Sequence, residues 1–151
     1  YPLKHTNIIL LPTVLFFKDC KDYIKMQPSE SYSLSIIGAY TDYKPKTNIT
    51  NQNLYEMDPR LYNENAVYIE PNKVIDHITG IFNIALFIGC TDIILDDGGI
   101  NDFWLPIYHH IKIINQVLEK YKDKFECITF AINNKQNYDI YSRYIHGTNT
   151  L

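Results

Sequence analysis

Helical and strand-like patterns alternate through the second half of the chain, and this order limits the fold more than any other feature. Apolar residues recur at steps of three and four over 71–89, 106–122 and 137–145, and each stripe predicts an amphipathic helix. Two short apolar runs, 92–95 and 127–132, lie between these helices and predict buried strands. This order is typical of an α/β fold, in which right-handed crossovers join parallel strands and helices lie on both faces.

Local signals define the ends of the first two helices. Pro71 and Pro106 suit the first helical turn, where an N–H group would have no helical partner. Gly89 follows the first stripe and suits the left-handed residue that often ends a helix. The residues expected to face the core are Val74, Ile75, Ile78, Ile81, Phe82, Ala85 and Leu86 in the first helix, Ile107, Ile111, Ile114, Leu118 and Tyr121 in the second, and Tyr138, Tyr141 or Ile140, and Tyr144 or Ile145 in the third.

The first half of the chain carries weaker patterns. Apolar runs at 8–11 and 14–17 predict two short strands separated by Pro12, and a third strand is expected over 32–39. The third of these strands becomes continuously apolar, which is typical of a strand that is covered on both faces. Residues 40–70 are polar and show little periodicity, and a connection of this length is usually functional or mobile.

Length and charge restrict the number of domains and the class of partner. The chain has 151 residues, of which 46% are hydrophobic, and no internal repeat, so residues 1–151 are expected to form a single domain with a sizeable core. A net charge of -3 argues against nucleic acid as a partner, because nucleic acid requires a basic surface. No apolar run reaches the length of a membrane span, so no membrane partner is expected.

The cysteines indicate a reducing compartment. Cys20, Cys90 and Cys127 are widely spaced and odd in number, which argues against a disulfide framework and against a zinc knuckle. Three buried or half-buried thiols fit this pattern better. We therefore expect an intracellular protein, either cytoplasmic or nuclear.

The segment that joins the strand 92–95 to the following helix is the best candidate for a ligand site. It places a helix N-terminus and the backbone of Gly98 and Gly99 at the carboxyl end of a strand, where open α/β sheets bind ligands. The two glycines fit an anion-binding nest, but a ligand-free Asp-Gly turn explains them equally well. Phe103 or Trp104 could stack on a base or a ribose; the alternative is that both cover the core beneath the helix.

Other polar groups give less specific signals. Asp96, Asp97 and Asp102 could hold a hard cation, but solvated loop acids explain them more simply, and no metal site is expected. His109 and His110 are adjacent and lack the helical spacing of a metal-binding pair, so surface or boundary positions are expected for both. No Ser/His/Asp, Cys/His, Walker or GxGxxG motif is present, so no cofactor is expected.

The order of these pieces resembles the macrodomain-like, microbial-type poly(ADP-ribose) glycohydrolase family. Residues 12–19 (PTVLFFKD) are similar to the family's SPNVxVFRD strand, and residues 33–39 (SLSIIGA) to its VSVISAxAP strand. The helix from Val74 and the strand after it resemble the family's helix and the strand before its GAWGCGAFGN loop. FECITFAI, followed by Asn137-Tyr138, resembles the family's FxxVVFAIxD…NY. The likeness covers most of the chain, in the family's order and spacing.

The resemblance implies a fold and a ligand. The fold would be a macrodomain-like, three-layer α/β/α arrangement with a mostly parallel mixed sheet, and we expect the N-terminal part of that domain to be missing from residues 1–151. The ligand would be ADP-ribose or another nucleotide diphosphate. By position in the loop, the residues implied to bind it are Gly98, Gly99, Ile100, Asn101 and Phe103.

Two departures from the family argue against hydrolase activity. The family's catalytic Gly-Gly-Gly segment and the Gln-Glu-Glu after it are absent, so no catalytic residue is assigned and no general acid or base is placed. The loop carries Asp96 and Asp97 where the family has small residues. Two like charges a few Å apart repel by on the order of 1–4 kcal/mol, so both acids are expected to oppose a diphosphate.

These observations lead to three hypotheses. The first is a divergent member of the ADP-ribose-binding or glycohydrolase lineage, catalytically inactive as it stands. The second is a structural or interaction protein, such as a subunit of a larger assembly with a protein partner, that kept the fold and lost the ligand. In the third, a segment upstream of Tyr1 or a partner chain supplies the missing loop and restores an enzyme.

Overall fold

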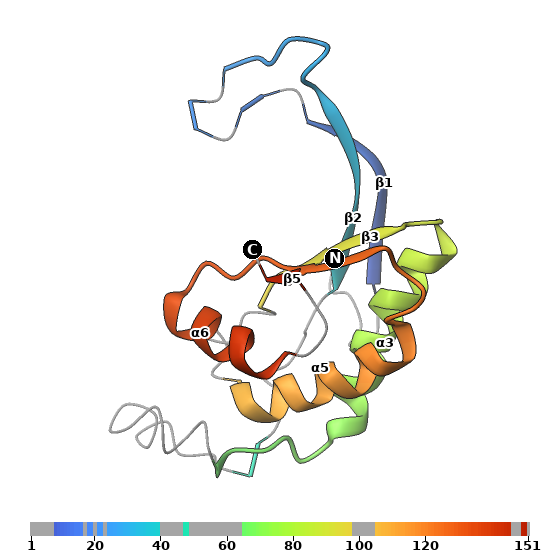
Figure 1. The fold of residues 1–151 in the computed structure, drawn as a ribbon. Coiled ribbons are helices and arrows are strands. Elements are labelled where there is room, and N and C mark those ends of the chain that lie inside the picture. The colour runs from blue at the N-terminus through green and yellow to red at the C-terminus, as the bar shows by residue number, and fades with distance from the viewer. Residues whose placement is uncertain are drawn as a thin grey trace. The chain divides into compact units, whose positions relative to one another are not determined.

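The computed structural model describes most of the chain and divides it into two compact units, Tyr1–Asp42 and Tyr43–Leu151. The described residues are 8–16, 18–19, 21–22, 24–39, 47–48, 65–97, 105–145 and 149–150. The elements in chain order are β1 (Ile8–Phe16), β2 (Tyr32–Ala39), α3 (Pro71–Phe87), β3 (Asp92–Leu95), α5 (Ile107–Tyr121), β4 (Cys127–Phe130), α6 (Lys135–Tyr144) and β5 (Asn149–Thr150), as Figure 1 shows. Among the described residues, no helix is both long and apolar enough to cross a membrane.

The first unit contains an antiparallel pair of strands, β1 and β2. Strand β2 has the bounds that the sequence predicts, but the two short strands predicted around Pro12 are one continuous strand, β1. The register shifts by one residue between Leu11 and Val14, and Thr13 has a φ of 61°. The expected break at Pro12 is therefore a β-bulge, which tolerates both a proline and a residue with positive φ.

The bulge gathers apolar side chains on one face of this pair. Ile9 lies opposite Gly38 and Phe16 lies opposite Tyr32, and side chains two positions apart on β2 share a face. The aromatic rings of Phe16 and Tyr32 stack with centroids 5.2 Å apart. The side chains on this face are Ile9, Leu11, Val14, Phe16, Tyr32, Leu34 and Ile36.

The second unit is built on a parallel sheet with the strand order β3-β4-β5. Asp92 to Leu95 pair in parallel with Cys127 to Phe130, which confirms the predicted parallel arrangement of these two strands. Strand β5, whose Asn149 pairs with Thr129, is not expected from the sequence. A two-residue strand carries no recognisable period, so only its tertiary pairing defines it.

The three described helices lie on one face of this sheet (Figure 1). The strands follow the order β3, β4, β5, and right-handed crossovers join them. Because both crossovers progress in the same direction, α5 and α6 lie on the same face of the sheet. Helix α3 packs against α5. The expected helices on both faces are therefore not seen in the described part of the chain. What the structure has is a small mixed α/β arrangement with two sheets.

The helices follow the predicted stripes closely. Helix α3 buries Ile78, Phe82 and Ala85, and Gly89, with a φ of 75°, follows its C-terminus as predicted. Every residue of the stripe predicted for α5 is buried, and α5 also buries His110, Ile113 and Val117. Helix α6 begins at Lys135, two residues before its predicted start, because the side chain of Asn134 caps it by accepting a hydrogen bond from the backbone of Asn137.

Candidate ligand site at the end of strand β3

The carboxyl end of β3 and the first turn of α5 are placed as the sequence predicts. Strand β3 ends at Leu95, Asp96 and Asp97 follow it, and α5 begins at Ile107. The carbonyl of Pro106 accepts a hydrogen bond of 2.8 Å from the backbone of His110, which defines the helix start. This edge of a parallel sheet is where α/β proteins usually bind ligands.

The five residues that the resemblance assigns to the ligand lie outside the described residues, as do Asp102 and Trp104. These five are Gly98, Gly99, Ile100, Asn101 and Phe103. The two acids that precede them are described and differ from each other, since Asp96 is exposed and Asp97 is half-buried. Nothing in the sequence distinguishes these two acids, so their difference in exposure is visible only in the structure.

Asp97 is held by helix α6. Its Oδ2 accepts a hydrogen bond of 3.1 Å from Nδ2 of Asn137, which is buried. The backbone N–H of Asn137 in turn donates to Oδ1 of the capping Asn134, at 3.1 Å. A carboxylate fixed by a buried amide on a capped helix has a defined position, which a solvated loop acid does not have.

Tyr68 joins the segment before α3 to the first turn of α5. Its hydroxyl shares a 2.8 Å hydrogen bond with Nδ1 of His110, and its backbone N–H donates to Nδ1 of His109 at 2.9 Å. The Tyr68 ring also contacts both imidazoles, with centroids 5.4 Å and 6.0 Å away. Because Nδ1 of His109 accepts a hydrogen bond, this nitrogen carries no proton and His109 is neutral here.

His110 is buried, which corrects the expectation of a surface or boundary position; His109 is half-buried, as expected for a boundary residue. His110 faces inward because it lies three residues after Ile107 and four before Ile114, and both of these residues face the core. Burial lowers the pKa of His110 to about 4, although the Asp97 carboxylate opposes this shift. His110 is therefore neutral at pH 7.

Tyr141 completes this group from helix α6. Its side chain is 0% exposed, and its ring contacts Phe130 of β4 with centroids 5.6 Å apart. Burial raises the pKa of the Tyr141 hydroxyl well above its ordinary value, and Asp97 raises it further. The hydroxyl has no hydrogen-bond partner among the described residues.

We call Tyr68, Asp97, His110, Asn137 and Tyr141 the Asp97 cluster. It brings a carboxylate, an amide, a neutral imidazole and two phenols to the carboxyl end of β3, drawn from four segments of the chain. Within the cluster, Tyr68 shares a hydrogen bond with His110, and Asn137 donates one to Asp97. In the described part of the chain, no three His, Cys, Asp or Glu residues are grouped to hold a metal ion.

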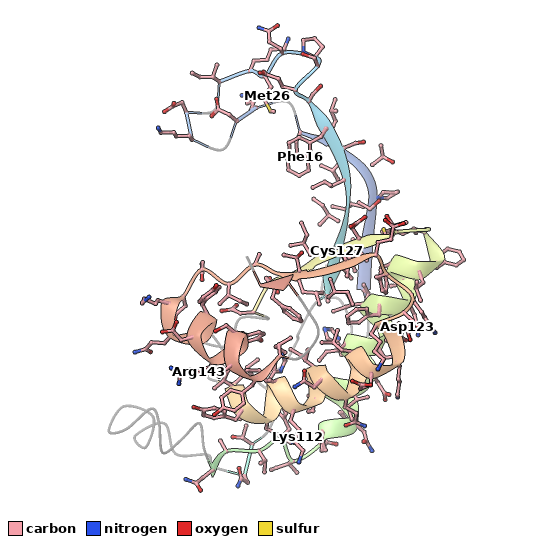
Figure 2. The ribbon with its side chains drawn as sticks, in the orientation of Figure 1. Phe16, Met26, Lys112, Asp123, Cys127 and Arg143 are labelled. Carbon is pink, nitrogen blue, oxygen red and sulfur yellow. The ribbon has the colours of Figure 1, made fainter. Side chains whose placement is uncertain are left out.

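Basic side chains of the same two helices are on the outside. Lys112 of α5 and Arg143 of α6 are both exposed, and Figure 2 shows where they lie on the two helices. Burial is the largest cause of the raised pKa of Tyr141, and Asp97, Tyr68 and Asp96 add to it.

Only partial signals for the Asp97 cluster are present in the sequence. Asn137 belongs to a segment that carries the family resemblance, and Tyr141 is one of two alternatives for an inward position on α6. Nothing in the sequence pairs Asp97 with Asn137, because the two are 40 residues apart. Tyr68 lies at the end of the polar connection, where no periodicity marks it as buried.

No protein-family model and no curated protein matches this chain. A solved structure does: the crystal structure of poly(ADP-ribose) glycohydrolase from Deinococcus radiodurans in complex with ADP-ribose is similar, with a TM-score of 0.56 and 19% sequence identity. The match covers 86% of this chain and 48% of that chain, so this chain spans about half the length of the glycohydrolase. At this identity the likeness shows the fold alone, which is similar to part of the glycohydrolase fold.

Proposed function

We propose that this chain is a divergent macrodomain-like protein of the ADP-ribose-binding lineage, without glycohydrolase activity as it stands. The observation that carries the proposal is the similarity in fold to a glycohydrolase that was solved with ADP-ribose bound. The position of the candidate site supports it, because the Asp97 cluster lies at the carboxyl end of a parallel strand beside a helix N-terminus.

The proposal includes the architecture that the resemblance implies. The proposed macrodomain-like domain spans residues 1–151, with three layers and a mostly parallel mixed sheet. The match to the glycohydrolase over 86% of this chain supports a single domain.

In this proposal the loop after Asp97 binds the ligand. Gly98, Gly99, Ile100, Asn101 and Phe103 contact ADP-ribose, with the glycine backbone directed at the diphosphate. The helix dipole of α5 favours an anion at this end of the sheet.

The proposed lack of catalysis rests on the residues of the printed sequence. Hydrolysis of a glycosidic bond needs a carboxyl group placed to protonate the leaving oxygen or to activate water. The Gly-Gly-Gly and Gln-Glu-Glu segments that supply it in the family are absent from these 151 residues. A segment upstream of Tyr1, or a partner chain, that supplied them would restore an enzyme.

Calorimetry with ADP-ribose tests the binding proposal. We expect saturable heat and a rise in melting temperature as the ligand concentration increases, since a ligand that binds only the folded state stabilises it. No heat and no thermal shift at millimolar ADP-ribose would contradict the proposal. Incubation with poly(ADP-ribose) tests the proposed lack of glycohydrolase activity. Release of ADP-ribose at a rate proportional to protein concentration would show an active enzyme.

A second candidate function is that of an interaction protein that kept the fold and lost the ligand. Two large apolar side chains favour it, since Phe87 is 88% exposed at the end of α3 and Ile94 is 68% exposed on β3. This candidate predicts a stable complex with a protein partner on size-exclusion chromatography of the natural source. A monomer that binds ADP-ribose under the same conditions would count against it.

A further inference from the structure

Two neighbouring histidines of helix α5 bind the segment before α3 through the same residue, Tyr68. The backbone N–H of Tyr68 donates to Nδ1 of His109 at 2.9 Å, and the Tyr68 hydroxyl shares a 2.8 Å hydrogen bond with Nδ1 of His110. The ring of Tyr68, which is buried, contacts both imidazoles. A displacement of Tyr68 from α5 would therefore break both hydrogen bonds together.

The hydrogen bond to His109 exists in one protonation state only. A backbone N–H is always a donor, so Nδ1 of His109 is the acceptor and carries no proton. Both ring nitrogens of an imidazolium carry protons, so protonated His109 would direct an N–H group at the N–H group of Tyr68. Protonation of His109 therefore replaces an attraction by a repulsion at this position.

The groups around the two imidazoles favour their neutral forms. Burial lowers the pKa of His109, and Lys112 on the same helix lowers it further. Burial lowers the pKa of His110 to about 4, and His109 and His77 of α3 act in the same direction. Asp97, after β3, opposes that shift. His109 is half-buried and His110 is buried, so we expect His109 to take up the first proton as the pH falls.

Tyr68 belongs to a stretch that is tied on its other side by groups that do not titrate. Thr47 forms an antiparallel bridge with Tyr68, and the backbone N–H of Asn48 donates to the carbonyl of Val67 at 3.0 Å. The Asn48 side chain accepts from the N–H of Val67 at 2.7 Å and donates to the carbonyl of Asn65 at 3.2 Å. Amides keep their charge across the range in which histidine titrates, so mild acid leaves these bonds intact.

We propose that Tyr68 and His109 form an acid-sensitive latch, which holds residues 65–68 on helix α5 at neutral pH and releases them when His109 is protonated. The pKa of His109 in the latched state lies below its ordinary value of 6.5, so added protons favour the released state. The latch is at full strength above about pH 6.5 and weakens as the pH falls below that value. Residues 47–48 stay bonded to the released segment.

Amide hydrogen exchange of the full chain, measured by NMR and corrected for the intrinsic effect of pH, reports on the latch at its own N–H group. We expect the protection of the Tyr68 amide to fall by up to about tenfold for each pH unit below about 6.5, as uptake of one proton requires. The protection of the Val67 amide, which is bonded to Asn48, should stay constant. Constant protection of Tyr68 between pH 7 and 5 would overturn the latch, and so would an equal fall at Val67, since the whole stretch would then be melting.

Substitution of His109 by asparagine tests which group titrates. The amide oxygen of asparagine can accept in place of Nδ1 and takes up no proton in this range, so His109→Asn should keep Tyr68 equally protected at pH 7 and 5. The matched control is His77→Gln, because burial also lowers the pKa of His77 but that residue lies outside the latch. The acid-induced loss of protection should persist in this control. Its persistence in His109→Asn instead would overturn the proposal.

Nitrogen NMR of the wild-type imidazoles tests the same proposal without any substitution. At pH 7 we expect Nδ1 of His109 to carry no proton, and as the pH falls it should gain one in step with the loss of protection at Tyr68. A proton on Nδ1 at pH 7 would overturn the latch, and so would protonation of His109 while the Tyr68 amide stays protected. These wild-type measurements decide the proposal even if His109→Asn does not fold.

Discussion

Two buried tyrosines of the second unit, Tyr121 and Tyr141, differ in the hydrogen bonding of their hydroxyl groups. Tyr121, at the C-terminus of α5, is 5% exposed, and its hydroxyl donates a 2.6 Å hydrogen bond to Oδ1 of Asn83. Tyr141, near the carboxyl end of β3, is 0% exposed and its hydroxyl has no partner among the described residues. The Tyr121 hydroxyl is therefore satisfied within the described residues, and the Tyr141 hydroxyl is not.

The surroundings of the two tyrosines agree with this contrast. Tyr121 belongs to an aromatic group in which Phe82 stacks on it at 4.9 Å and contacts Phe125 at 5.6 Å. The Tyr141 ring contacts Phe130, and burial, followed by Asp97, Tyr68 and Asp96, raises the pKa of its hydroxyl. We therefore expect the aromatic group to contribute more to the free energy of unfolding than the Asp97 cluster, because burial of polar groups costs free energy.

The largest effect should come from the aromatic end. Phe82 is fully buried between α3 and α5, so Phe82→Ala removes both its transfer energy and its packing against Tyr121. We expect a loss of about 3–5 kcal/mol in the free energy of unfolding, measured in urea. A loss below about 1 kcal/mol would show that the aromatic group is not the main source of stability.

Acid should act mainly on the Asp97 cluster. The pKa of His110 is lowered to about 4 in the folded protein, and it is about 6.5 in an unfolded chain. Between these values the unfolded state binds more protons, so stability is full above pH 6.5, falls as the pH drops towards 4, and is constant for this group below that. The fall should be about 3 kcal/mol, with His109 and His77 acting in the same direction, because burial lowers both of their pKa values.

Substitution of His110 by glutamine, which can still bond to the Tyr68 hydroxyl, should remove most of this pH dependence. Urea unfolding at a series of pH values measures it. A wild-type protein whose stability is flat from pH 7 to 4.5 would show that His110 is not held neutral by burial.

Removal of the Tyr121 hydroxyl sharpens the comparison between the two tyrosines. Tyr121→Phe loses the hydrogen bond to Asn83 and should lower the free energy of unfolding by about 1 kcal/mol. Urea unfolding of this variant beside Tyr141→Phe gives the contrast directly. Equal destabilisation by both substitutions would mean that both hydroxyls are satisfied within the fold.

The smallest effect should come from Asp96. The sequence predicts that both acids oppose a diphosphate, but only Asp96 is exposed, while Asp97 is tied to Asn137. Asp96→Asn should therefore tighten ADP-ribose binding about two- to fivefold, because a screened charge near the surface contributes at most about 1 kcal/mol. Calorimetry at low and high salt checks this, since the gain should shrink as salt rises.

Features of the fold that depend on residues close together in the sequence could be predicted, and features that depend on contacts between distant segments could not. The stripe of α5, the glycine after α3 and the parallel pairing of β3 with β4 arise from spacing within 20 residues or from the order of elements, and all three were predicted correctly. The resemblance to glycohydrolases was confirmed at the level of the fold. The five residues assigned to the ligand stay predictions.

The features that the sequence did not predict depend on contacts between distant segments. The hydrogen bond between His110 and Tyr68 joins residues that are 42 positions apart along the chain. The hydrogen bond from Asn137 of α6 to Asp97 likewise joins residues that are 40 positions apart. The start of α6 was missed by two residues because Asn134 has the preferences of both a turn residue and a helix cap.

The bulge in β1 lets the strand carry one extra residue without changing which side chains share a face. Side chains of a regular strand alternate between its faces, so Leu11 and Val14, which are three positions apart, would otherwise point to opposite faces. Deletion of Thr13 would place Val14 two positions after Leu11, with Val14 still opposite Leu34 and Phe16 still opposite Tyr32. We therefore expect this unit to tolerate the deletion, whereas insertion of a further residue beside Thr13 should move Val14 and Phe16 to the other face.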